Sequence, residues 1–272
     1  MTEEHTEWDE ALEANRRLWD AWTEVHEDSE FYAVDAFRAG ETSLQSIELQ
    51  HLGDAVAGRR LLHLQCHFGL DTLSWARLGA DVVGVDLSPK AIRLARTLAE
   101  ELDIPACFIE SDVLDLRSRL DDTFDIVYTS YGVLDWLSDL DRWARVVADS
   151  LVPGGTFFMV EFHPLAGLLG DNGRTLEHPY FPRREPLRFE EKGSYADTEA
   201  PVEGESVVWP HSLSEIFMAL LGAGLRLDAF HEYAESPYDC FPFTKEVEPG
   251  RAVIPNLEHS VPLVYSLRAT KV

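Results

Sequence analysis

The stretch that decides the fold is Leu61-Leu62-His63-Leu64-Gln65-Cys66-His67-Phe68-Gly69-Leu70-Asp71-Thr72. It begins with a short apolar run, residues 61–64, that is typical of a buried strand. A tight loop ending at Gly69 follows, and Asp71-Thr72 then starts an apolar helical pattern that stops at Gly79. A strand that leads through a tight loop into a helix is the first unit of an open α/β sheet, in which ligands bind at the carboxyl ends of the strands.

The alternation of strand and helix continues along the chain. Ser88-Pro89 predicts a helix that begins with Ser as N-cap, and Pro153-Gly154-Gly155 predicts a sharp turn before the fifth strand. The last two strands are not separated by a helix, so we expect them to be antiparallel. The sequence therefore predicts a mostly parallel sheet with helices on both faces. The expected strands are residues 61–64, 81–86, 106–110, 124–129, 156–162, 224–233 and 261–270.

Two segments lie outside this alternation. Residues 1–54 are predicted to form an N-terminal helical cap, with an amphipathic helix over 7–27, and residues 55–272 form the main domain. Residues 163–206 are a long insertion that leaves the carboxyl end of the fifth strand, and we interpret them as a substrate lid. The cap is rich in aromatic residues, which either cover the sheet or close over a bound ligand: Trp19, Trp22, Phe31 and Tyr32.

Composition limits the classes of function. The 272 residues carry a net charge of -26, and only four of the 23 basic residues are lysines. The acidic residues are dispersed, which favours adaptation to high salt, with an ordinary acidic cytoplasmic protein as the alternative. This charge disfavours nucleic-acid binding, and the chain has neither an apolar run of membrane-spanning length nor a signal-like start. We therefore expect a cytoplasmic protein that binds neither membrane nor nucleic acid. Apart from composition, we expect a small-molecule substrate and a monomer or homodimer.

Acidic residues follow successive predicted strands. Asp86 ends the second strand, where a carboxylate can accept both hydroxyls of a ribose. Asp112 follows the third strand, where it can accept a hydrogen bond from the amino group of an adenine. Together with the loop at residues 65–69, they predict a site for an adenosine-containing ligand.

These motifs resemble those of the class I S-adenosylmethionine-dependent methyltransferases. The resemblance rests on residues 61–69, Val-Val-Gly-Val-Asp-Leu-Ser at 82–88, Ser-Asp-Val at 111–113, Phe-Asp-Ile-Val-Tyr-Thr-Ser-Tyr-Gly-Val-Leu at 124–134 and Leu-Val-Pro-Gly-Gly at 151–155. It implies a Rossmann-like, doubly wound sheet of about seven strands with an antiparallel last strand. It also implies methyl transfer from S-adenosyl-L-methionine, with S-adenosyl-L-homocysteine as product.

The family usually has an acid followed by Gly-x-Gly-x-Gly in the first loop. Here His63 stands at the acidic position, Gln65 and His67 replace the first two glycines, and only Gly69 matches. The two side chains either contact the donor or acceptor, or hold the loop farther from the ligand. The resemblance implies these donor-binding residues: Gln65, Cys66, His67, Gly69, Asp86, Leu87, Asp112, Val113, Ser130 and Tyr131.

A general base is needed only if the acceptor is protonated. The candidates are His67, Tyr131, His163 and His211. His63, Cys66 and His67 do not predict a metal site, because residues on a strand do not converge as they do on a helix; we expect His63 to be a hydrogen-bonded core histidine and the protein to hold no metal. Two other functions stay open: a protein that binds S-adenosylmethionine or its product without turnover, and a nicotinamide-dependent oxidoreductase, although the loop lacks the latter's Gly-x-Gly-x-x-Gly.

Overall fold

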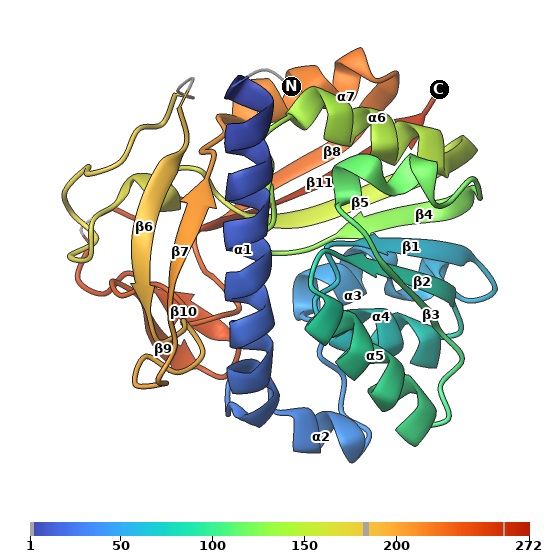
Figure 1. Ribbon diagram of the computed structural model, residues 1–272, viewed down its shortest axis with the longest axis horizontal. Coiled ribbons are helices and arrows are strands. Elements are labelled where there is room, and N and C mark those ends of the chain that lie inside the picture. The colour runs from blue at the N-terminus through green and yellow to red at the C-terminus, as the bar shows by residue number, and fades with distance from the viewer. Residues whose placement is uncertain (1–2, 182–184, 258) are drawn as a thin grey trace.

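The computed structural model describes residues 3–181, 185–257 and 259–272. Its centre is a seven-stranded sheet with strands in the order β3-β2-β1-β4-β5-β11-β8 (Figure 1). Strands β1 to β5 are parallel, and β11 pairs antiparallel with both β5 and β8. This confirms the predicted α/β fold, including its antiparallel last strand. The strands are β1 (Arg60–Leu64), β2 (Asp81–Asp86), β3 (Cys107–Glu110), β4 (Phe124–Thr129), β5 (Leu151–Phe162), β8 (Leu225–Tyr233) and β11 (Val264–Lys271).

Helices cover both faces of the sheet because successive strand residues point to opposite sides. Leu62 and Leu64 of β1 pack with Trp143 of α6 on one face, whereas Leu61 packs with Trp75 of α4 on the other. The helices begin as the sequence indicates, since Ser88 Oγ accepts from Ala91 N at the start of α5. Their bounds are α1 (Glu3–Asp28), α2 (Val34–Arg38), α3 (Ser46–Leu52), α4 (Leu70–Arg77), α5 (Pro89–Glu101), α6 (Leu140–Ser150) and α7 (Leu213–Gly222).

The fifth strand begins earlier than predicted. Residues 153–155 do not form a separate turn before it; they lie within β5, where the pairing with β4 jumps from Phe124↔Leu151 to Ile126↔Thr156. Gly154 has φ 77°, a left-handed conformation that suits glycine. The predicted turn therefore lies inside β5 rather than before it, because the chain pairs with β4 on both sides of three extra residues that have no partner there.

Helix α1 stands between the main sheet and two small hairpins (Figure 1). Asn15 of α1 exchanges two hydrogen bonds with the backbone of Val207, at 2.7 and 2.8 Å. On its other side, Asp20 accepts from Ser88 Oγ at 2.6 Å, which ties α1 to the start of α5. The hairpins are β6 (Leu187–Lys192) with β7 (Glu203–Val208), and β9 (Lys245–Glu248) with β10 (Arg251–Val253).

The predicted insertion at 163–206 contains β6 and most of β7. Its residues 182–184, like residues 1–2 of the predicted cap, lie outside the described residues. The division into a cap at 1–54 and a main domain at 55–272 stays a prediction.

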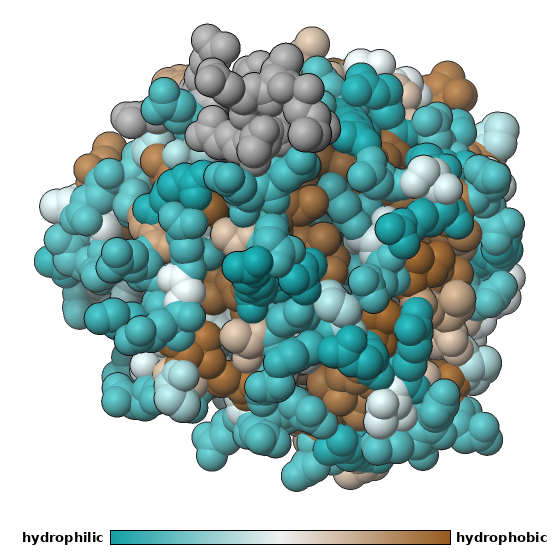
Figure 2. All heavy atoms as spheres, in the orientation of Figure 1, coloured by the Kyte–Doolittle hydropathy of each residue, from teal (hydrophilic) through white to brown (hydrophobic). Residues whose placement is uncertain are grey.

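The surface is mostly polar on the face drawn in Figure 2, with apolar patches between hydrophilic side chains. This agrees with the dispersed acidic residues of a chain whose net charge is -26. Of the helices in the described part of the chain, none is both long and apolar enough to cross a bilayer.

Candidate functional site

A cavity of about 500 Å³ opens where β1, β2, β3 and β4 end, beneath α1 and part of the insertion. Cavities of this size are typical of small-molecule sites. The structure places all ten residues that the resemblance implied for donor binding on its walls. They are Gln65, Cys66, His67, Gly69, Asp86, Leu87, Asp112, Val113, Ser130 and Tyr131.

The loop after β1 has a left-handed backbone at every second residue. The φ angles are 56° at Gln65, 50° at His67 and 79° at Gly69. A Cβ at Gly69 would lie 2.6 Å from the Phe108 ring, so a side chain there would force that ring to move. Gln65 and His67 adopt a conformation that costs a non-glycine residue roughly 1–2 kcal/mol. The loop thus keeps glycine-like backbone angles despite carrying two side chains.

Asp86 is oriented by the backbone around it. Its Oδ2 accepts from His67 N at 2.7 Å and its Oδ1 from Ser88 N at 2.8 Å. A carboxylate has about four acceptor sites, so one on each oxygen stays available. Burial raises the pKa of Asp86 to about 6. Asp86 can therefore accept hydrogen bonds from two hydroxyl groups of a ligand in the cavity.

Asp112 occupies the tip of the neighbouring strand. Its Oδ1 accepts a hydrogen bond from Leu114 N at 2.9 Å. This contact does not occupy Oδ2, which can accept a hydrogen bond from a ligand. Burial raises the pKa of the Asp112 carboxyl from its ordinary value. Because β2 and β3 are adjacent and parallel, Asp86 and Asp112 line the same cavity side by side.

His67 belongs to a chain of hydrogen bonds that joins three segments. Its Nε2 lies 2.9 Å from His26 Nδ1 of α1, and His26 Nε2 lies 2.7 Å from Ser194 Oγ of the insertion. Burial lowers the pKa of His67 well below its ordinary value and that of His26 to about 3. Both rings are therefore neutral near pH 7, and His67 Nδ1 is buried without a hydrogen-bond partner in the described structure.

Aromatic side chains form the roof of the cavity. Trp22 Nε1 donates to Gly193 O at 2.8 Å, and the hydroxyls of Tyr32 and Tyr195 are 2.5 Å apart. The insertion is thus attached to α1 and to the segment that follows it. The four aromatic residues singled out in the cap line the cavity, which favours the interpretation that they close over a ligand: Trp19, Trp22, Phe31 and Tyr32.

Sequence reasoning missed a pair of acids beside β4, of which Glu48 is fully buried and Asp71 is half-buried. Glu48 of α3 accepts from Tyr131 Oη at 3.0 Å, and Asp71 of α4 accepts from Ser43 Oγ at 2.6 Å. Tyr128 Oη lies 3.5 Å from a carboxylate oxygen of each. Burial raises the pKa of Glu48 to about 8 and that of Asp71 above its ordinary value. The sequence indicates Asp71 only as part of a helix start, and nothing in the local sequence singles out Glu48.

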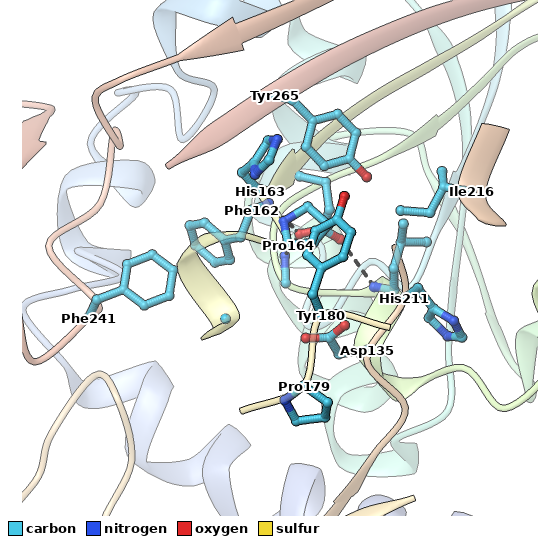
Figure 3. A pocket seen from close by; sticks show the side chains of 14 residues that line it. Asp135, Phe162, His163, Pro164, Pro179, Tyr180, His211, Ile216, Phe241 and Tyr265 are labelled. Atoms are coloured by element: carbon cyan, nitrogen blue, oxygen red, sulfur yellow. Dashed lines mark hydrogen bonds between the residues drawn. The ribbon is translucent and has the colours of Figure 1, made fainter. Parts of the chain in front are cut away.

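His163 lies apart from the other candidates. It lines a second cavity of about 100 Å³, where Nδ1 accepts from Leu165 N at 3.0 Å and Nε2 lies 3.0 Å from Glu232 Oε1. Figure 3 shows this cavity, with the hydroxyls of Tyr180 and Tyr265 pointing toward one another. The structure therefore separates His163, together with His211 on the wall of the same small cavity, from His67 and Tyr131.

Glu161 at the end of β5 fixes the loop between the two cavities. Its carboxylate accepts from the backbone N–H groups of Gly132, Val133, Leu134 and Phe162. Burial raises the pKa of Glu161 to about 7. It positions Gly132 and Val133 on the cavity wall.

His63 is a core histidine, as predicted. Its side chain is buried, and Nδ1 lies 2.8 Å from Thr72 Oγ1. In the described residues, no three side chains of His, Cys, Asp or Glu are grouped so as to hold a metal ion.

The family model and the curated relatives match part of this chain. Residues 61–155 match the family described as "Methyltransferase domain". A ubiquinone biosynthesis O-methyltransferase of Xanthomonas campestris is 33% identical over 119 residues, which are 43% of this chain and 49% of that protein. The same enzyme of Xanthomonas oryzae is 35% identical over 104 residues, 38% and 43% of the two chains. The chain thus spans about half the length of the curated relatives that it matches.

Solved structures match over most of the chain. An S-adenosylmethionine-dependent methyltransferase from Mesorhizobium loti has a TM-score of 0.56 at 23% identity, covering 79% of this chain and 92% of that one. Another, from Clostridium acetobutylicum, has a TM-score of 0.57 at 12% identity, covering 93% and 98%. The chain therefore has the fold of S-adenosylmethionine-dependent methyltransferases, and its residues 61–155 match the model of a methyltransferase domain.

Proposed function

We propose that the protein transfers a methyl group from S-adenosyl-L-methionine to a small-molecule acceptor. The observation that carries the proposal is the pair Asp86 and Asp112, at adjacent strand tips on the wall of one cavity of about 500 Å³. Asp86 has acceptor sites for two ribose hydroxyls, and Asp112 can accept from the adenine amino group. The left-handed loop at 65–69 brings the backbone up to the same ligand.

S-adenosylmethionine supplies an already activated methyl group, so alignment and exclusion of water are the main tasks of the protein. The strand tips hold the nucleoside in one place. The aromatic roof, attached through Trp22 to Gly193 and through Tyr32 to Tyr195, keeps water from the reacting atoms. His67 and Tyr131 line this cavity and remain the candidates for a base, whereas His163 lies in the smaller one.

A small acceptor suits the cavity because the roof covers it. The matching proteins differ in the atom that their names specify: the Xanthomonas enzymes are named O-methyltransferases, and a structure with a TM-score of 0.54 at 15% identity is a glycopeptide N-methyltransferase. Their acceptors are therefore not transferred to this chain. That the protein is a cytoplasmic monomer or homodimer, adapted to high salt, without metal or nucleic acid, stays a prediction.

Calorimetric titration with S-adenosylhomocysteine tests donor binding, with NADH as the control ligand. We expect binding of the first and not of the second. Release of S-adenosylhomocysteine in the presence of a panel of small amines, phenols and carboxylic acids then tests turnover. Binding without turnover on every class would favour a binding protein, and NADH binding alone would favour an oxidoreductase.

A further inference from the structure

One end of the cavity combines buried carboxylates with aromatic rings. We call it the acidic end: Asp71, Phe31, Tyr131 and Tyr238 on the cavity wall, and Glu48 behind Tyr131. The Tyr238 ring lies 5.0 Å from that of Tyr131 and 5.4 Å from that of Phe31. These rings come from three separate segments, and the two acids come from α3 and α4. Aromatic faces and carboxylates both attract cations.

The acids at this end have no basic partner in the described structure. Glu48 is fully buried, and the side-chain partners of both carboxylates are hydroxyl groups, with backbone contacts to Glu48 in addition. Among the described residues that line the cavity there is no lysine or arginine. Burying an acid without a cation is costly, because the charged form loses its hydration. The raised pKa values of Glu48 and Asp71 express this cost. A positively charged ligand would offset it.

A second observation also indicates a hydrogen-bond donor in the ligand. Gln65 Oε1 is buried and has no partner in the described structure, while its Nε2 donates to Val133 O at 2.9 Å. The bond to Val133 fixes the amide, so the oxygen is left as an acceptor for a ligand. An ammonium group has three N–H donors, so it offers one for this oxygen and others for Asp71, which lines the same cavity.

We propose that the methyl acceptor is an amine on an aromatic or apolar frame, whose nitrogen is held at the acidic end. The inference rests on the proposed methyltransferase function and specifies its substrate class. The nucleoside would occupy the tips of β2 and β3 at Asp86 and Asp112. The acidic end lies in the same cavity beyond β1, around the tip of β4, and the inference places the acceptor nitrogen there.

The chemistry is balanced without a further reactant. The ammonium form first gives one proton to a carboxylate of the acidic end. The nitrogen lone pair then forms the N–C bond as the S–C bond breaks, and that electron pair stays on sulfur to give the neutral thioether. The methylated ammonium product carries the positive charge that the sulfonium lost. Asp71 lines the cavity and is the nearer proton acceptor, and Glu48 lies behind Tyr131.

Calorimetry on protein saturated with S-adenosylhomocysteine tests the inference with three matched probes: phenethylamine, phenethyl alcohol and hydrocinnamate. We expect the amine to bind at least about tenfold more tightly than the neutral and anionic probes, as a hydrogen bond to a charged group implies. Asp71→Asn and Glu48→Gln should remove this preference. Asp54→Asn and Glu41→Gln, which change exposed acids of nearby segments, should keep it.

Each other outcome has a distinct meaning. Equal binding of all three probes would overturn the inference while leaving donor binding intact. If Asp71→Asn lowers the affinity for S-adenosylhomocysteine itself, the acidic end holds the ammonium group of the donor and the inference is wrong. If the wild type does not bind S-adenosylhomocysteine at all, the proposed function fails first. Thermal melts of each variant separate these results from a loss of folding.

Discussion

Asp86→Asn should weaken binding of S-adenosylhomocysteine without preventing folding. The carboxylate already accepts from His67 N at 2.7 Å and from Ser88 N at 2.8 Å, and has one acceptor site left on each oxygen. An asparagine amide keeps one oxygen, and its NH₂ group would face one of these N–H donors. The ligand therefore loses a charge-assisted hydrogen bond. Such a bond contributes about 1.5–3 kcal/mol to the binding free energy, so its loss should raise Kd roughly 10- to 150-fold.

The matched control is Asp81→Asn. Asp81 lies at the opposite end of the same strand, and its side chain is 77% exposed beside Arg60. Calorimetry should give the wild-type Kd for this variant, and thermal melts should show both variants folded. An Asp86→Asn protein that is folded and binds S-adenosylhomocysteine as tightly as the wild type would refute the ribose contact.

Three further changes test the roof, the acidic end and the loop after β4. Trp22→Phe removes the hydrogen bond that Trp22 Nε1 donates to Gly193 O at 2.8 Å. Hydrogen–deuterium exchange of the backbone amides around Gly193, measured by mass spectrometry, should then become about fivefold faster. Unchanged exchange would show that this bond does not hold the insertion. Burial raises the pKa of Glu48 from 4.5 to about 8, so the folded state keeps a proton that the unfolded chain has released. The free energy of unfolding of the wild type should therefore fall more steeply from pH 4.5 to 8 than that of Glu48→Gln in urea titrations, and equal slopes would contradict the burial of an acid there. Glu161→Gln leaves two backbone N–H groups without an acceptor, at roughly 1–3 kcal/mol each, and an unaltered urea midpoint would count against its role in fixing Gly132 and Val133.

Local signals located the framework of the site from the sequence. Ser88-Pro89 marks the start of α5 by its own chemistry, and the apolar run before it ends at Asp86 as observed. Because parallel strands end at one edge of a sheet, the order of Asp86 and Asp112 along the chain was enough to place them together.

The remainder of the site depends on contacts between distant segments. His26 and His67 are 41 residues apart, and Tyr131 and Glu48 are 83 residues apart, so periodicity carries no information about either pair. At the glycines of β5 the local signal for a turn was right, but only the pairing with β4 on both sides shows that the turn interrupts a strand instead of preceding it. Tertiary packing decided each of these features.

A crystal structure with S-adenosylhomocysteine bound tests the central claim most directly. We expect the ribose hydroxyls within hydrogen-bond distance of Asp86, the adenine amino group at Asp112, and the sulfur turned toward the acidic end. A nucleoside bound elsewhere, or a cavity left empty by a saturating concentration of the ligand, would contradict the account.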